Sequence, residues 1–244
     1  MALAMYSFWL RVGAAMVHIV YIALVVASWT HSSSAEGKQG SDGETISMTI
    51  LHTNDIHSRI LESDKRGFEC DDKKRNESKC FGGVARITKT VRDLKRNNTN
   101  PLFLNAGDFF QGTLWYSVLK YNIVSAVMAN MSYDTVCLGN HEFDDGPEGL
   151  VPFLLKMKEA NVTVLGTNLN TSMEPLFENI TLPKSIVYNI SGMQVALLGV
   201  VTTETRTIAK PGGVQILDEA ETINAEIAEL KKKNISVFIL VSHV

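Results

Sequence analysis

Gly139-Asn140-His141-Glu142-Phe143-Asp144 is the stretch that decides the fold of this chain, because it follows an apolar run and repeats a form found twice upstream. Asn54-Asp55-Ile56-His57 and Gly107-Asp108-Phe109-Phe110-Gln111-Gly112 also follow apolar runs directly. Open α/β sheets bind ligands beyond the carboxyl ends of their strands. The carboxylate, amide and imidazole groups of the three stretches are therefore expected to meet at one edge of a sheet.

The apolar spacing around these stretches alternates between strand-like and helix-like periods. Strands are expected at 46–53, 102–104, 135–138, 162–165, 185–190, 194–200 and 235–241. Helices are expected at 84–94, 114–131, 150–157 and 223–230. Ser191-Gly192 separates two of the strands, which predicts a β-hairpin there. The alternation as a whole predicts a layered α/β fold with a mainly parallel or mixed sheet.

The composition is that of an ordinary globular protein. With 244 residues and 45% apolar content, the chain can bury the core of a single α/β domain. Its formal net charge of −3 gives no electrostatic basis for binding a nucleic acid polymer or an anionic membrane.

The N-terminal segment has the pattern of a secretory leader. One basic residue, Arg11, precedes the apolar run 12–29, and small residues follow up to Ala35. We expect a signal peptide and junction over residues 1–35, with cleavage near Ala35 or Ala27. An uncleaved signal anchor is the alternative, because about 18 apolar residues is the lower limit for a membrane span. Either reading places the protein outside the cell or on the extracellular face of the plasma membrane.

Glycosylation acceptors support export independently of the leader. Asn-x-Ser/Thr is a surface signal in secreted proteins, and a cytosolic protein has no reason to accumulate it. Chance in an Asn-rich sequence is the alternative, and it accounts for a few acceptors more readily than for the whole set. The acceptors are Asn76, Asn97, Asn130, Asn161, Asn170, Asn179, Asn189 and Asn234.

Two of the three cysteines bracket a polar loop. Cys70 and Cys80 enclose residues 71–79, and in an oxidising compartment a disulfide closing this loop is the simplest interpretation. Zinc binding by this pair is not expected, since no second Cys or His pair lies nearby in the sequence. Cys137 lies within an apolar run and is expected to be a buried core thiol.

The polar stretches carry the ligand types that phosphate ester hydrolysis needs. Two divalent cations about 3.5–4 Å apart neutralise the phosphate, supply hydroxide at neutral pH and stabilise the leaving oxygen. Asp108 is the candidate bridging carboxylate, and Asp55 and His57 share one face of an extended segment. Asn140 offers an amide oxygen to the second cation and His243 an imidazole nitrogen. This mixed donor set favours zinc, with manganese, calcium or magnesium as alternatives.

Each stretch taken alone also fits an ordinary structural role. Gly-Asp after an apolar strand is a common turn, and Asn140 could cap a helix. The three stretches together closely resemble the binuclear metallophosphatase superfamily. Residues 51–59, 82–86 and 111–113 narrow the resemblance to the secreted 5′-nucleotidase and apyrase family.

The resemblance implies a β-sandwich flanked by helices and the same assignment of metal ligands. It further implies that His141 is not a ligand but a catalytic residue that stabilises the transition state beside the leaving group. Asp144 would orient the His141 ring and favour its imidazolium form. A disulfide in the position of the Cys70–Cys80 pair also matches the family.

The resemblance covers residues 46–244, expected to be an N-terminal metallophosphatase domain that is incomplete at its C-terminus. The family's next ligand-bearing stretch and its C-terminal nucleotide-binding domain are absent. The implied activity is extracellular hydrolysis of nucleotides, either AMP to adenosine or ATP and ADP to AMP, with release of phosphate. Because the shell of ligands is incomplete, the 244-residue chain itself is expected to show little hydrolysis.

Two other functions remain open from the sequence. The chain could be another phosphoesterase of the superfamily, or a secreted non-catalytic glycoprotein that binds a metal or a partner. The expected partner is a nucleotide and not a nucleic acid polymer. A membrane would be involved only through an uncleaved leader or an anchor beyond residue 244, and the sequence does not define an oligomeric state.

Overall fold

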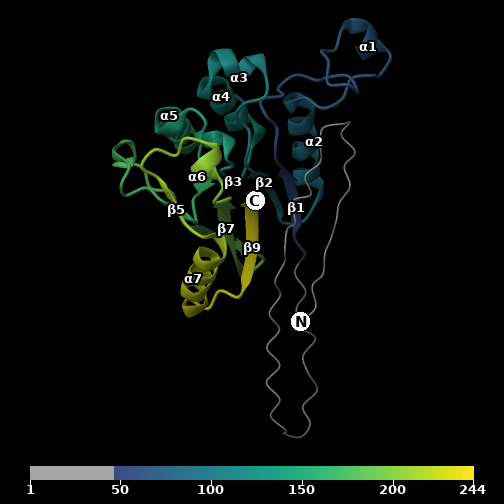
Figure 1. The fold of residues 1–244 in the computed structure, drawn as a ribbon. Helices are drawn as coiled ribbons and strands as arrows, with labels where there is room; N and C mark the ends of the chain where they lie inside the picture. The colour runs from purple at the N-terminus through teal and green to yellow at the C-terminus, as the bar shows by residue number, and fades with distance from the viewer. Residues whose placement is uncertain (1–46) are drawn as a thin grey trace, which may run out of the picture.

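The computed structural model describes residues 47–244, and its first layer is a four-stranded parallel sheet. The strands lie in the order β1 (Thr49–Thr53), β2 (Pro101–Ala106), β3 (Thr135–Cys137) and β4 (Thr163–Leu165). Helices α2 (Val84–Asn97), α4 (Tyr121–Met131) and α5 (Gly146–Glu159) lie between these strands along the chain. The parallel order brings the carboxyl ends of β1, β2 and β3 to one edge (Figure 1).

A second, three-stranded sheet packs on the first. It contains β6 (Ser185–Ile190), β7 (Met193–Val201) and β9 (Val237–His243). The pair β6–β7 is the expected hairpin, whereas β9 runs parallel to β7 after a crossover through α7 (Glu219–Lys232). Short elements complete the fold: β5 (Leu169–Asn170) pairs with β8 (Gln215–Ile216), and α6 (Thr205–Ile208) follows β7.

The apolar side chains form a core between each pair of layers. Leu102, Leu104 and Ala106 of β2 face the second sheet and pack with Ile239 and Val241 of β9. The opposite face of the first sheet packs against α4 and α5, and α7 packs on the outer face of β7 and β9. The order of layers is therefore helices, sheet, sheet, helix (Figure 1). This arrangement confirms the predicted α/β sandwich flanked by helices.

Several element boundaries differ from the sequence predictions. The helix expected over 114–131 is broken into α3 (Leu114–Leu119) and α4 at Lys120, whose φ is 52°. The break is held by Asp145, which accepts hydrogen bonds from the Tyr116 hydroxyl at 2.7 Å and from Lys120 Nζ at 3.1 Å. Within the described residues β1 begins at Thr49, where the sequence pattern predicted a strand from position 46. Tertiary contacts at positions distant in sequence cause the helix break.

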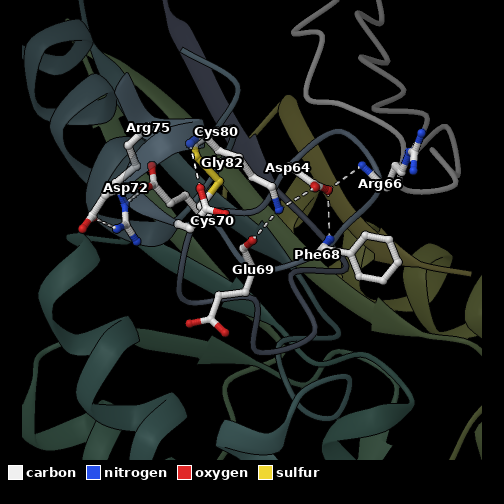
Figure 2. The surroundings of a disulfide bond; sticks show 12 residues. Asp64, Arg66, Phe68, Glu69, Cys70, Asp72, Arg75, Cys80 and Gly82 are labelled. Carbon is white, nitrogen blue, oxygen red and sulfur yellow. Dashed lines mark hydrogen bonds and ion pairs between the residues drawn. A yellow bond between two sulfur atoms is a disulfide. The ribbon is translucent and has the colours of Figure 1, made fainter. Parts of the chain in front are cut away.

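The loop between β1 and α2 is closed by a disulfide between Cys70 and Cys80 (Figure 2). Inside it lies α1 (Asp72–Asn76), a helix that the sequence did not predict. The Asp71 side chain caps α1 by accepting the Lys74 N–H at 2.8 Å. Asp64 stabilises the preceding turn by accepting the backbone N–H groups of Arg66 and Phe68. The third cysteine, Cys137, is buried and free, as expected.

The glycosylation acceptors lie on the surface. All eight lie outside the buried core, and seven of them are exposed, with Asn170 half-buried. The predicted signal peptide and junction at residues 1–35 fall outside the described residues. Among residues 47–244, no helix is both long enough and apolar enough to cross a bilayer.

Candidate metal centre

The predicted ligands lie in tight turns at the carboxyl ends of the parallel strands. Asp55 and His57 follow β1, Asp108 follows β2, and Asn140 and His141 follow β3. Asp55, His57 and Asp108 have left-handed backbones, with φ of 51°, 48° and 56°. The expectation that Asp55 and His57 share one face of an extended segment is therefore wrong, because a left-handed turn, not a strand, places them beside each other.

Asp108 is the centre of the cluster. Its Oδ2 atom lies 3.2 Å from His243 Nε2, 3.9 Å from His57 Nε2 and 4.0 Å from His141 Nε2. Asp55 Oδ1 lies 3.5 Å from His57 Nε2. The Asp108 side chain is only 4% exposed, so these groups converge on a buried carboxylate. The structure brings all of the predicted ligands together.

His243 reaches the cluster from the second sheet. Ile239 and Val241 of β9 point between the sheets, and His243 lies on the same face because side chains alternate along a strand. Its Nδ1–H donates to the Ala106 carbonyl oxygen at 2.9 Å, which leaves Nε2 facing the site. Nε2 lies 3.2 Å from the Asn140 Oδ1 atom. Asn140 and His243, which the sequence analysis assigned to the same cation, therefore lie next to each other.

His57 is oriented in the same way. Its Nδ1–H donates to the Phe110 carbonyl oxygen at 3.2 Å, so Nε2 faces Asp55 and Asp108. A backbone carbonyl on one ring nitrogen is the usual means of fixing the tautomer of a metal-binding histidine. Both histidines therefore present the unprotonated nitrogen that a cation needs when the ring is neutral.

His141 and Asp144 form a separate pair beside the cluster. His141 Nδ1 lies 2.6 Å from Asp144 Oδ2, within a 3-10 turn over His141–Phe143 that places positions three apart on one side. The His141 side chain is 37% exposed, the most open of the three histidines. Its Nε2 atom consequently faces both Asp108 and solvent.

The carboxylates and imidazoles alter one another's protonation. Burial lowers the pKa of His243, but the Asp108 carboxylate outweighs it and raises the pKa to about 9. The hydrogen bond with Asp55 raises the pKa of His57 against the effect of burial. Burial would raise the pKa of Asp55, but hydrogen bonds with His57 and Asn54 outweigh it and lower the pKa. The raised pKa values of both histidines reflect the neighbouring carboxylates, whose negative charge also attracts cations.

Two residues that shape the site were missed by the sequence analysis. Glu142 is 3% exposed, and its carboxylate accepts backbone N–H groups from both the Asp108 turn and Gly139. Burial raises the pKa of Glu142, and the Asp108 charge adds to the effect. Gly139 lies against the Asp108 backbone, leaving no room for a side chain. The only sequence signal for Glu142 was its place inside the stretch that decides the fold.

The donor set fits divalent metal ions. Asp55, Asp108 and His243 each offer an atom within 4.8 Å of the others, and so do His57, Asp108 and His141. The two groups share Asp108, the predicted bridging carboxylate, but they combine Asp55 with His243 and His57 with His141, which is not the predicted division of the ligands between two cations. Oxygen and imidazole donors in such a mixture suit zinc and related transition metals.

Comparison with known proteins places the chain in a family. A family model described as calcineurin-like phosphoesterase matches residues 48–243, so the chain belongs to the calcineurin-like phosphoesterases. Within this family its relatives are apyrases and 5′-nucleotidases, which confirms the resemblance inferred from the sequence.

The relatives are considerably longer than this chain. An Anopheles gambiae apyrase is 33% identical over 92% of this chain and 40% of its own length. The Homo sapiens 5′-nucleotidase is 37% identical over 80% of this chain and 33% of its own length. The crystal structure of a 5′-nucleotidase precursor from Thermus thermophilus matches with a TM-score of 0.70 and 32% identity, over 81% of this chain and 37% of that one. The chain thus spans about two fifths of the length of these relatives or less.

Proposed function

We propose that this chain carries the metal centre of an extracellular nucleotide hydrolase of the 5′-nucleotidase or apyrase type. The observation that carries the proposal is the convergence of three imidazole Nε2 atoms within 4.0 Å of one buried carboxylate oxygen of Asp108. One cation would be held by Asp55, His57 and Asp108, and the other by Asp108, Asn140 and His243. Two such cations neutralise a phosphate ester and make hydroxide available at neutral pH.

The protein groups around the centre have distinct tasks. Asp108 would hold the two halves of the site together, since its Oδ2 atom lies 3.9 Å from Nε2 of His57 in one proposed set and 3.2 Å from Nε2 of His243 in the other. His141 stands apart, and its Nε2 can donate a proton toward the oxygen of a departing group. Asp144 holds His141 Nδ1 at 2.6 Å and fixes the ring in the required orientation. A positioned proton donor of this kind contributes about 10²–10⁴-fold in rate.

The substrate class follows from the relatives. Those named apyrase and 5′-nucleotidase support nucleotides as substrates, with AMP, ADP and ATP as the candidates. Residues 46–244 would form the metallophosphatase domain, and base recognition would require groups outside it. The leader pattern and the exposed glycosylation acceptors support secretion or display on the extracellular face of the membrane.

The test is metal-dependent phosphate release. The chain as printed and the longest product of its transcript would be secreted from insect cells, stripped with EDTA and assayed with AMP and ADP before and after addition of zinc. We expect stoichiometric zinc binding by both and zinc-restored phosphate release by the longer product. Asp108→Ala should abolish zinc binding, whereas Asp71→Ala, in the exposed disulfide loop, serves as the matched control. Phosphate release that is unaffected by EDTA would refute a metal-dependent mechanism.

A further inference from the structure

Glu142 is a buried carboxylate that makes no contact with the proposed ligand atoms and yet binds the backbone on both sides of them. Its Oε1 atom accepts N–H groups from Phe109 at 2.8 Å and Phe110 at 3.0 Å. Its Oε2 atom accepts N–H groups from Asp108 at 2.9 Å and Gly139 at 2.6 Å. One side chain therefore satisfies four backbone donors.

Those four donors have no alternative partner. Among residues 47–244, no backbone carbonyl accepts a hydrogen bond from them. Three are consecutive and begin with the left-handed residue Asp108, and successive N–H groups in such a turn form a concave anion-binding nest. Buried N–H groups without an acceptor are costly, so the turn depends on the Glu142 carboxylate.

The same turn supports the loop after β1. Its carbonyl groups point away from Glu142 and accept the N–H groups of the residues around the other proposed ligands. The Asp55 N–H donates to the Gly107 carbonyl oxygen at 3.1 Å. The N–H groups of His57 and Ser58 donate to the carbonyl oxygens of Asp108 at 3.0 Å and Phe109 at 2.8 Å, respectively. In return, the Asp108 Oδ1 atom accepts the His141 N–H at 3.0 Å. The three ligand-bearing loops thus form one backbone network anchored at Glu142.

We propose that Glu142 is a positioning residue that sets the spacing between Asp108 and the loops carrying the other proposed ligands. The expected effect of Glu142 on catalysis rests on the proposed metal-dependent function, whereas the hydrogen-bond network does not require a metal. Glutamine at this position would keep the length of the side chain but replace one accepting oxygen with an NH2 group facing N–H donors. Two of the four N–H groups would then lose their acceptor, and the turn would shift.

The first experiment needs no variant. Amide hydrogen exchange of the metal-free wild-type chain should show Asp108, Phe109, Phe110 and Gly139 protected to the level of the β2 amides, because Glu142 holds them. Rapid exchange of these four amides in a folded chain would overturn the proposal. This result is independent of any metal, so it separates the network from the proposed function.

The second experiment uses Glu142→Gln, with Glu178→Gln as the matched control. Glu178 is exposed and its side chain makes no hydrogen bond among residues 47–244. The same change of charge at this position should therefore leave zinc affinity unchanged. Both variants would be titrated with zinc against a competing chelator. We expect Glu142→Gln to bind zinc about 10–100-fold more weakly, as is typical when a group supporting a metal ligand is lost.

The pattern of losses distinguishes positioning from a merely structural role. Positioning predicts weaker zinc binding, a lower kcat at saturating zinc in the longer product and a KM close to that of the wild type. A variant that is less stable but binds zinc with wild-type affinity would overturn the proposal. If the wild-type chain binds no zinc while the four amides are protected, the proposed function fails and the network stands. If Glu142→Gln does not fold, the wild-type exchange measurement alone decides.

Discussion

Gly139→Ala should damage the proposed metal centre without replacing any ligand. A Cβ atom at Gly139 would lie 2.6 Å from the Asp108 backbone nitrogen and 2.9 Å from Asp108 Cγ, with the carboxylate Oδ1 closer still. Ordinary contact begins near 3.4 Å, so one of the two loops must move by about 0.8 Å. Functional constellations tolerate about 0.5 Å of error, so the displacement exceeds what the site can absorb.

We expect two measurable effects. The free energy of unfolding, measured with urea, should fall by about 1–3 kcal/mol, as in other overpacked sites. Zinc affinity, measured by competition with a chromophoric chelator, should fall by about 10–100-fold. The control is Gly192→Ala: nothing lies within 4 Å of its Cβ, but φ is +90°, so stability should fall by about 1–2 kcal/mol with zinc affinity unchanged. A Gly139→Ala chain with wild-type zinc affinity would refute the steric argument.

Three further predictions concern the ligands, the disulfide and pH. His141→Ala should retain zinc and lose most turnover, whereas Asp108→Ala should lose both; equal zinc loss would contradict this division. Replacing Cys70 and Cys80 with serine should lower the free energy of unfolding by about 2–3 kcal/mol or less, because the closed loop is short; free thiols at both positions in secreted wild-type protein would show that the bridge does not form. Zinc affinity should rise with pH from about 7 to 9 and then level off, because the raised pKa of His243, about 9, means that zinc must displace a proton below that value; a flat profile would contradict it.

The positions of the proposed ligands could be predicted from the sequence because they depend on strand ends. Asp108 and Asn140 follow short apolar runs that predict buried strands, and the parallel strands that these runs form end at a common edge. His243 could be predicted because it continues the alternation of Ile239 and Val241. In each case a local pattern located the end of a strand, and the fold class then brought those ends to one edge.

Other features could not be predicted because their causes are distant in sequence. The break at Lys120 depends on Asp145, which lies 25 positions away. The left-handed turn at Asp108 depends on Glu142, which lies 34 positions away. An acidic residue next to a histidine suggests a catalytic or surface role, and nothing in its neighbours indicates that it will be buried among backbone N–H groups.

The proposed centre draws its ligands from both sheets of the sandwich, which has a consequence for how the site is assembled. Asp55 and Asp108 come from the first sheet and His243 from the second, and the Ala106 carbonyl already ties His243 to the edge of the first sheet. The packing of Ile239 and Val241 between the sheets thus determines how far His243 reaches. Because interiors are close-packed and transmit small displacements, apolar residues between the sheets contribute to the geometry of the site as directly as Glu142 does from within the loops.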